Sequence, residues 1–148
     1  MRIMEVRVGD RLKYINLLLL GDEQMSMIER YLYRGDMFVL TDGGVKSVCI
    51  VTEEGKGVYE IKNLATAQEH QGKGYGQKLV SFIAEKYREP GAVLYVGTGE
   101  NPFTLKFYEK CGFMKSHIVK GFFTDNYDHP IYEGGVRLRD MIYLKRKL

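Results

Sequence analysis

The sequence predicts an α+β domain with a mixed sheet, and three observations support this class. The chain has 148 residues, which is the usual size of one domain. Segments with the two-residue alternation of strands stand beside segments with the helical spacing of apolar residues. No stretch has the composition of a linker, so we expect residues 1–148 to form a single domain.

The first half of the chain predicts a strand, two helices and three further strands. Met4 to Val8 alternates as a strand does. Asp10 is expected to cap a helix that ends at Gly21, and a second, shorter helix is expected to end at Gly35. The next predicted strands are Met37 to Leu40, Val45 to Val51 and Val58 to Ala65. The hairpin turn Asp42-Gly43-Gly44 joins the first two of them.

The second half predicts two helices among further strands. An apolar stripe between Tyr75 and Tyr87 indicates the clearest helix of the chain, which ends before Pro90. Pro102 to Lys110 is a second predicted helix, because proline is favourable in a first helical turn. The strands expected here are Ala92 to Val96, Phe113 to Val119 and Val136 to Leu144.

Composition argues against several classes of protein. The net charge is +3, and only Lys145-Arg146-Lys147 clusters basic residues, so we expect no nucleic-acid partner. The longest apolar run, Leu17 to Leu20, is far shorter than the roughly 20 residues that cross a bilayer. Cys49 and Cys111 lack metal-ligand spacing, and the chain has three histidines. We therefore expect a cytoplasmic protein without metal or membrane partner.

A glycine-rich turn, Gln71-Gly72-Lys73-Gly74-Tyr75-Gly76, connects a predicted strand to a predicted helix. The first N–H groups of a helix have no partner within it, and the helix dipole favours negative charge there. Glycine lets a phosphate approach the backbone, and Lys73 and Lys78 add positive charge. The alternative is that the glycines only shape the turn. The pattern matches neither a P-loop nor a dinucleotide fingerprint.

The same six residues resemble the Q/R-x-x-G-x-G/A signature of the GCN5-related N-acetyltransferases (GNAT). Residues 101–113, from Asn101 to Phe113, resemble the second motif of that family, and the order of predicted elements is similar over nearly the whole chain. The resemblance is to small, single-domain bacterial members. It implies an α/β/α-layered, mostly antiparallel sheet of about seven strands, splayed between strands four and five and flanked by about four helices.

The resemblance implies acetyl-CoA as the co-substrate, held between residues 58–66 and 92–97. The main chain of Leu64, Ala65 and Thr66 would pair with the pantetheine arm as an added strand does. Asn101 would hydrogen-bond the pantetheine, or would only cap the helix that follows it. The residues that would bind the pyrophosphate are Gln71, Gly72, Lys73, Gly74, Tyr75 and Gly76.

By the same resemblance, Tyr108 would be the general acid that protonates the leaving thiolate, and Glu60 would be the base. Tyr108 could instead pack beneath the co-substrate, and Glu60 could be an ordinary strand carboxylate. A backbone N–H near Leu64 would stabilise charge on the acetyl oxygen. Strand alternation places Glu60, Lys62 and Leu64 on one face unless a bulge intervenes.

The connection between the last two predicted strands is rich in aromatic and acidic residues. We expect Asp125, Tyr127 and Asp128 to bind a cationic amine there. The alternatives are a surface loop or a contact within a homodimer. If either alternative holds, we expect the acceptor site to lie nearer Glu60 and the first two helices.

These expectations describe an enzyme that transfers an acetyl group from acetyl-CoA to a primary amine by direct attack in a ternary complex. The expected acceptor is a small cationic molecule. Two alternatives stay open: a protein lysine or N-terminus as the acceptor, and a CoA-binding regulatory domain without turnover.

Overall fold

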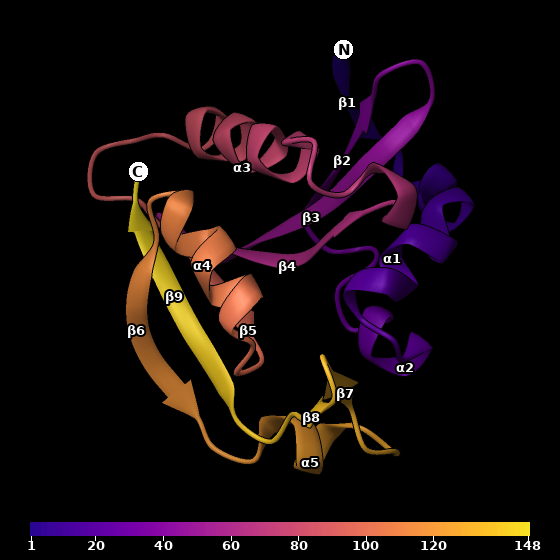
Figure 1. Cartoon of the computed structure of the whole chain (residues 1–148). Coiled ribbons are helices and arrows are strands. Elements are labelled where there is room, and N and C mark those ends of the chain that lie inside the picture. Colours follow the sequence, from indigo (N-terminus) through magenta and orange to yellow (C-terminus); the bar gives the residue numbers. More distant parts are fainter.

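The computed structural model describes all residues, 1–148, and confirms the predicted fold class (Figure 1). A strand, two helices and three long strands make up the first half, as the sequence predicts. The bounds are β1 (Arg2–Val6), the 3₁₀ helix η1 (Val8–Tyr14), α1 (Ile15–Gly21), α2 (Met25–Ile28), β2 (Asp36–Thr41), β3 (Val45–Gly55) and β4 (Val58–Thr66).

The second half contains the two longest helices and the strands that complete the sheet. Its elements are η2 (Gln68–His70), α3 (Tyr75–Lys86), β5 (Val93–Thr98), α4 (Pro102–Lys110), β6 (Met114–Val119), α5 (Phe122–Asn126), β7 (Tyr132–Glu133), β8 (Val136–Arg137) and β9 (Met141–Lys147). No helix has the length and apolar character that a membrane span requires.

Seven strands form one sheet in the order β1-β2-β3-β4-β5-β9-β6, and β7 and β8 form a separate hairpin. Every neighbouring pair in the large sheet is antiparallel except β4 and β5. These two strands pair only from Val58 and Val93 to Ile61 and Val96. Because β4 continues to Thr66 beyond the last pair, the sheet opens there, and the two strands diverge in Figure 1.

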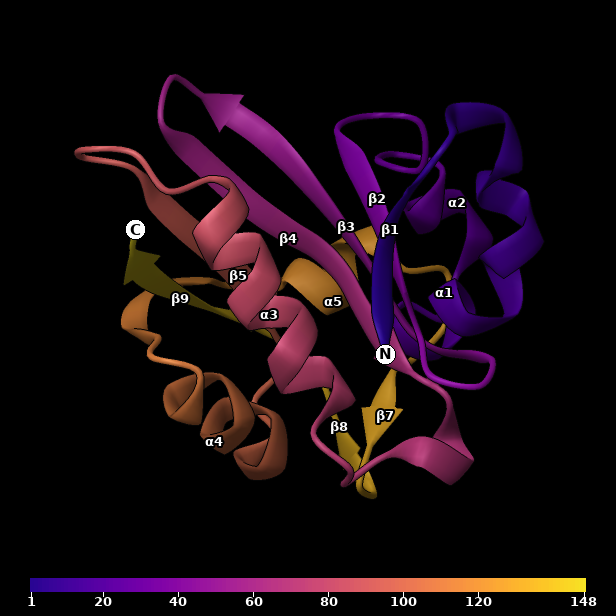
Figure 2. The same cartoon turned by 90° about the horizontal axis from the view of Figure 1, so that it is seen from above.

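Helices cover both faces of the sheet. Figure 2 shows α3 and α4 on one side of β4 and the α1–α2 pair on the other. A core of 16 buried residues, including Leu79, Ile83 and Leu105, packs against α3 and α4. A second core of 10 buried residues, including Leu18 and Ile28, packs against α1 and α2. The structure therefore has the predicted α/β/α layers.

A bulge interrupts β4 at Lys62. Ile50 of β3 lies opposite Asn63, and Val51 lies opposite Ile61, so Lys62 has no direct partner. Ile61 belongs to the core below α3, whereas Ala65 belongs to the core below α1. The bulge that the sequence analysis allowed for is therefore present, and it changes which face each later residue of β4 occupies.

The predicted helix that Asp10 caps is wrong at its start. Residues 8–14 form the 3₁₀ helix η1, and the α-helical turns begin at Ile15. The carboxylate of Asp10 pairs with Lys13 at 3.1 Å rather than capping a helix. Arg11 in the same segment is buried, and its guanidinium donates to the carbonyl oxygens of Leu32, Arg34 and Gly35 at 2.8–3.1 Å.

The strand predicted from Val136 to Leu144 is two strands, β8 and β9. β8 pairs with β7 outside the large sheet, and Leu138 after it is buried against Phe123 and Ile131 in a third, small core before β9 joins the sheet. Asp140 then accepts a hydrogen bond of 2.8 Å from the N–H of Gly121. This core holds α5 and the β7–β8 hairpin together, close to the open end of β4 and β5.

Candidate active site

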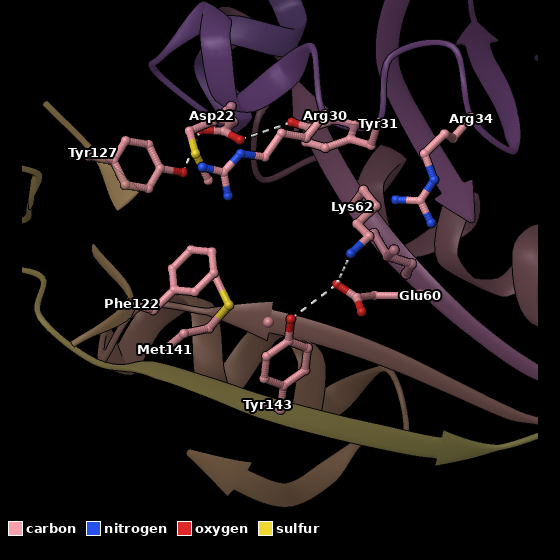
Figure 3. A pocket seen from close by; sticks show the side chains of 13 residues that line it. Asp22, Arg30, Tyr31, Arg34, Glu60, Lys62, Phe122, Tyr127, Met141 and Tyr143 are labelled. Atoms are coloured by element: carbon pink, nitrogen blue, oxygen red, sulfur yellow. Dashed lines mark hydrogen bonds and ion pairs between the residues drawn. The ribbon is translucent and has the colours of Figure 1, made fainter. Parts of the chain in front are cut away.

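Two adjoining cavities lie where β4 and β5 separate. The splay cavity, of about 240 Å³, is lined by Asn63, Leu64, Gly97, Tyr108 and Glu133 among others. The side cavity, of about 200 Å³, lies between the turn after α2 and β9 (Figure 3). The residues that line both cavities are Asp22, Ile61, Lys62, Gly97, Tyr127 and Met141. These six residues mark the junction between the cavities.

The glycine-rich turn presents a row of free backbone donors. Gly72 and Gly74 have φ of +79° and +86°, and no other atoms lie within 4 Å of where a Cβ would be. The N–H groups from Gly72 to Gln77 find no acceptor within the protein. Because these groups also lie at the N-terminus of α3, the turn fits a pyrophosphate.

Gly76 allows the start of α3 to pack closely against α4. A Cβ at this position would lie 3.2 Å from Cζ of Phe107. A side chain here would therefore press on Phe107, next to Tyr108. Glycine at this position therefore lets the glycine-rich turn lie close to the helix that carries Tyr108.

The backbone of Leu64 faces the opening between the strands. Ala67 donates to the carbonyl of Lys46, and hydrogen-bonded pairs alternate along antiparallel strands. Ala65 therefore bonds with β3, while Leu64 and Thr66 direct their N–H and C=O groups away from β3. The carbonyl of Thr66 already accepts from the side-chain amide of Gln71, so the groups left free are the N–H and C=O of Leu64 and the N–H of Thr66. These fit an extended amide-containing arm such as pantetheine.

Other predicted co-substrate residues have structural contacts of their own. The amide of Gln71 donates to the carbonyl of Thr66 at 3.1 Å, and Tyr75 donates to Asp42 at 2.7 Å. Ala65 is buried, whereas Lys73 is exposed. None of these contacts blocks the backbone donors of the turn.

Asn101 caps α4, as one of the two predicted roles requires. Its Oδ1 accepts from the N–H of Phe103 at 2.9 Å, and its Nδ2 donates to Glu133 at 3.1 Å. Glu133 belongs to β7 and lines the splay cavity. The pair therefore connects the β7–β8 hairpin to the start of α4.

Tyr108 lies at the wall of the splay cavity and is 7% exposed. Its ring packs edge-to-face against Phe107 and Phe113, and its hydroxyl has no hydrogen-bond partner within the protein. Burial raises the pKa of Tyr108. The side chain is therefore protonated at neutral pH, and its hydroxyl is free to donate a proton.

Glu60 lines the side cavity and faces β9. Its Oε2 forms an ion pair with Lys62 at 2.9 Å and accepts from Tyr143 at 3.2 Å (Figure 3). Burial and the neighbouring Glu60 raise the pKa of Tyr143. Both contacts use the same carboxylate oxygen, so Oε1 has no partner within the protein.

Asp22 is the carboxylate that sequence reasoning missed. It follows α1 and lines both cavities. Its Oδ2 accepts from Tyr31 at 3.0 Å, and its Oδ1 accepts from Tyr127 at 2.6 Å. Burial raises its pKa, and the bonds from Tyr127 and Tyr31 oppose that change. A single aspartate after a helix carries no periodic signal, so only the fold reveals it.

Of the three acceptor-binding residues expected after β6, only Tyr127 reaches the cavities. Asp125 and Asp128 are exposed and line neither cavity. The carboxylate of Asp128 instead contacts the ring of His129 at 2.6 Å, and Glu23 contacts the same ring at 3.3 Å. These two carboxylates raise the pKa of His129. Asp125 and Asp128 therefore lie outside both cavities, whereas Glu133 of the same connection lines the splay cavity.

The comparisons with known proteins agree with this geometry. The family model described as "Acetyltransferase (GNAT) domain" matches residues 33–115. The protein of Bacillus subtilis (strain 168) named uncharacterized N-acetyltransferase YvbK is 32% identical over an alignment of 149 positions, which covers 97% of this chain and 96% of that protein.

Solved structures extend the similarity to the whole fold. An IAA acetyltransferase from Bacillus cereus is 36% identical, with a TM-score of 0.91 and 99% of each chain covered. A GNAT family acetyltransferase from Elizabethkingia anophelis, solved with acetyl-CoA bound, is 32% identical. Its TM-score is also 0.91, with 99% of this chain and 97% of that chain covered. This chain therefore belongs to the GCN5-related N-acetyltransferase family and is an acetyl-CoA-dependent N-acetyltransferase.

Proposed function

We propose that the acceptor is a primary amine, which attacks the acetyl group directly in a ternary complex. The observation that carries this proposal is the junction of the two cavities. Tyr108 lines the splay cavity, and Asp22 lines both cavities, so a proton donor and a proton acceptor face one connected space.

The co-substrate side of the proposal rests on backbone groups. The free N–H groups from Gly72 to Gln77 would hold the pyrophosphate, and the outward-facing backbone of Leu64 would pair with the pantetheine. The two contacts would direct the thioester into the splay cavity. The N–H of Leu64 could then donate to the acetyl oxygen as negative charge develops there.

We assign proton donation to Tyr108. The leaving thiolate has an ordinary thiol pKa of about 8.5, well below that of a tyrosine hydroxyl. The buried Tyr108 stays protonated, so its hydroxyl would donate to the sulfur as the carbon–sulfur bond breaks, and the tyrosinate, as the stronger base, would then regain a proton from solvent. The absence of a competing acceptor within the protein leaves its hydroxyl available for this step.

We assign the amine proton to Asp22. An alkyl ammonium, with a pKa of about 10.4, must lose a proton to become a nucleophile. Asp22 lies at the junction of the cavities without a cation within 4.0 Å, whereas Glu60 is paired with Lys62 and lines only the side cavity. Glu60, suggested by the family resemblance, is the alternative proton acceptor.

The test measures release of free thiol from acetyl-CoA with a panel of acceptors. The panel contains small amines, a lysine-containing peptide and a peptide with a free N-terminus. Turnover with a small amine, well above the rate of acetyl-CoA hydrolysis, supports the proposal. Turnover with the peptides alone would identify a protein acetyltransferase. Binding of acetyl-CoA by calorimetry without turnover of any acceptor would identify a binding domain.

A further inference from the structure

The side cavity contains more charge than an amine requires. Five of the residues that line it carry charge, and these are Asp22, Arg30, Arg34, Glu60 and Lys62. Two of the cations are already neutralised. Lys62 pairs with Glu60 at 2.9 Å, and Arg34 pairs with Glu54, behind the cavity, at 2.6 Å. A third contact of 3.7 Å joins Lys62 to Glu54 and closes this network.

The two remaining charges, on Arg30 and Asp22, have no partner of opposite sign. Arg30 bonds only the neutral amide of Asn126, at 3.1 Å, and no carboxylate lies within 4.0 Å of its guanidinium. Asp22 bonds two tyrosine hydroxyls and no cation. Figure 3 shows both side chains at the upper edge of the cavity, with no ion pair drawn between them.

The positions of Asp22 and Arg30 indicate how an acceptor molecule would be oriented in the cavities. Asp22 lines both cavities, so it lies where the amine would meet the thioester. Arg30 lines only the side cavity, beyond the junction. The apolar walls around this space come from Met27, Phe122 and Met141. An acceptor with its amine at Asp22 therefore extends past apolar side chains toward an unneutralised guanidinium.

We propose that the acceptor is a small zwitterion, in which one molecule carries the primary amine and a carboxylate. Asp22 receives the ammonium, and Arg30 binds the carboxylate through the planar donor pair that guanidinium offers. This inference rests on the proposed amine acceptor and adds its second functional group. It replaces the purely cationic molecule expected from Asp125 and Asp128.

Arg30 and Arg34 are held in place by the fold. Both belong to the turns that follow α2, four residues apart, and the same segment contributes Tyr31 to Asp22. Buried Arg11 fixes the end of this segment through the carbonyls of Leu32, Arg34 and Gly35. The cations therefore project from a braced segment rather than a loose loop.

The test uses three matched probes at each of several lengths: an ω-amino acid, its carboxamide and the diamine of the same length. Release of thiol gives kcat/KM for each at one pH. We expect the best amino acid to exceed its carboxamide and diamine at least about tenfold, and Arg30→Gln to bring the acid-to-amide ratio close to one. Arg30→Lys should restore part of the ratio, because it restores the charge.

Arg88→Gln is the control, because Arg88 is exposed on the far end of the α3 region and lines neither cavity. It should keep the acid-to-amide ratio of the unmodified protein. Calorimetric binding of acetyl-CoA verifies that each variant is folded. Equal turnover of acids, amides and diamines, or an unchanged ratio in Arg30→Gln, would overturn the inference and leave the amine acceptor intact. Failure of every amine would overturn both proposals.

Discussion

The hydroxyl of Tyr127 donates a hydrogen bond of 2.6 Å to Oδ1 of Asp22, although 105 positions separate the two residues in the chain. A second bond, from the N–H of Asp128 to Gln24 at 3.0 Å, lies beside it. Together they join the segment after α5 to the segment between α1 and α2. The junction of the cavities is therefore assembled from both ends of the chain.

We expect Asp22→Asn to lower kcat/KM for the amine about 100-fold, because the amide cannot accept the proton. The loss should shrink as the pH rises toward the pKa of the amine, about 10.4, since more of the amine is then already neutral. The measurement is a pH profile of kcat/KM for the unmodified protein and for the variant.

Glu60→Gln and Asp10→Asn give this experiment its comparison and its control. Asp10 pairs with Lys13 and lines neither cavity, so Asp10→Asn should follow the profile of the unmodified protein. Glu60→Gln should lose less activity than Asp22→Asn. A larger loss in Glu60→Gln, with the same rescue at high pH, would assign the base to Glu60.

The same aspartate should make the folded protein less stable as the pH rises. Burial raises the pKa of Asp22 in the folded state above its unfolded value of 3.8, so folding favours the neutral form. The stabilising contribution of the neutral form is present below pH 3.8 and is lost as the pH rises through the folded pKa. The side-chain amide of the Asp22→Asn variant stays neutral throughout.

Urea unfolding across this acidic range tests the expectation. The free energy of unfolding of the unmodified protein, minus that of Asp22→Asn, should fall as the pH rises and then level off. Subtraction removes the titration of groups that both proteins share. A difference that rises with pH would mean that the tyrosine hydrogen bonds outweigh the cost of burial.

The fold was predictable because local patterns agreed with it. The spacing of apolar residues in α3, the proline at the start of α4 and the Asp42-Gly43-Gly44 turn each describe a structure formed by neighbouring residues. The departures occur where distant contacts decide. Arg11 forms three bonds to carbonyls 21–24 positions away, and Leu138 between β8 and β9 is buried in a small core with Phe123 and Ile131.

The site was predictable only where a motif describes it. The backbone donors around Gly72 and Gly74 follow from a contiguous signature, and Tyr108 follows from the second motif. Asp22 and Arg30 belong to no motif, and in the sequence neither differs from an ordinary solvent-exposed charged residue near a helix end. Asp128 shows the converse, because acidic composition does not reveal that its side chain turns toward His129, away from both cavities.

Gly74→Asp should weaken binding of acetyl-CoA by more than tenfold. Gly74 has φ of +86° and is the N-cap of α3, so aspartate would add backbone strain and a negative charge beside the expected phosphates. Gly91→Asp is the matched control, because Gly91 has a similar φ of +80° with equally open surroundings but lies far along the chain from the turn. Calorimetry on both folded variants measures the effect. Equal affinities would separate the turn from the co-substrate.

Tyr108→Phe should lower kcat about 100-fold while the affinity for acetyl-CoA is retained. The substitution keeps the ring that packs against Phe107 and Phe113 and removes only the hydroxyl, which has no partner within the protein. Stability should therefore change little. Because the missing proton matters most for a poor leaving group, thioesters with more acidic thiols should recover part of the rate. A fall in affinity with kcat intact would instead assign Tyr108 a packing role.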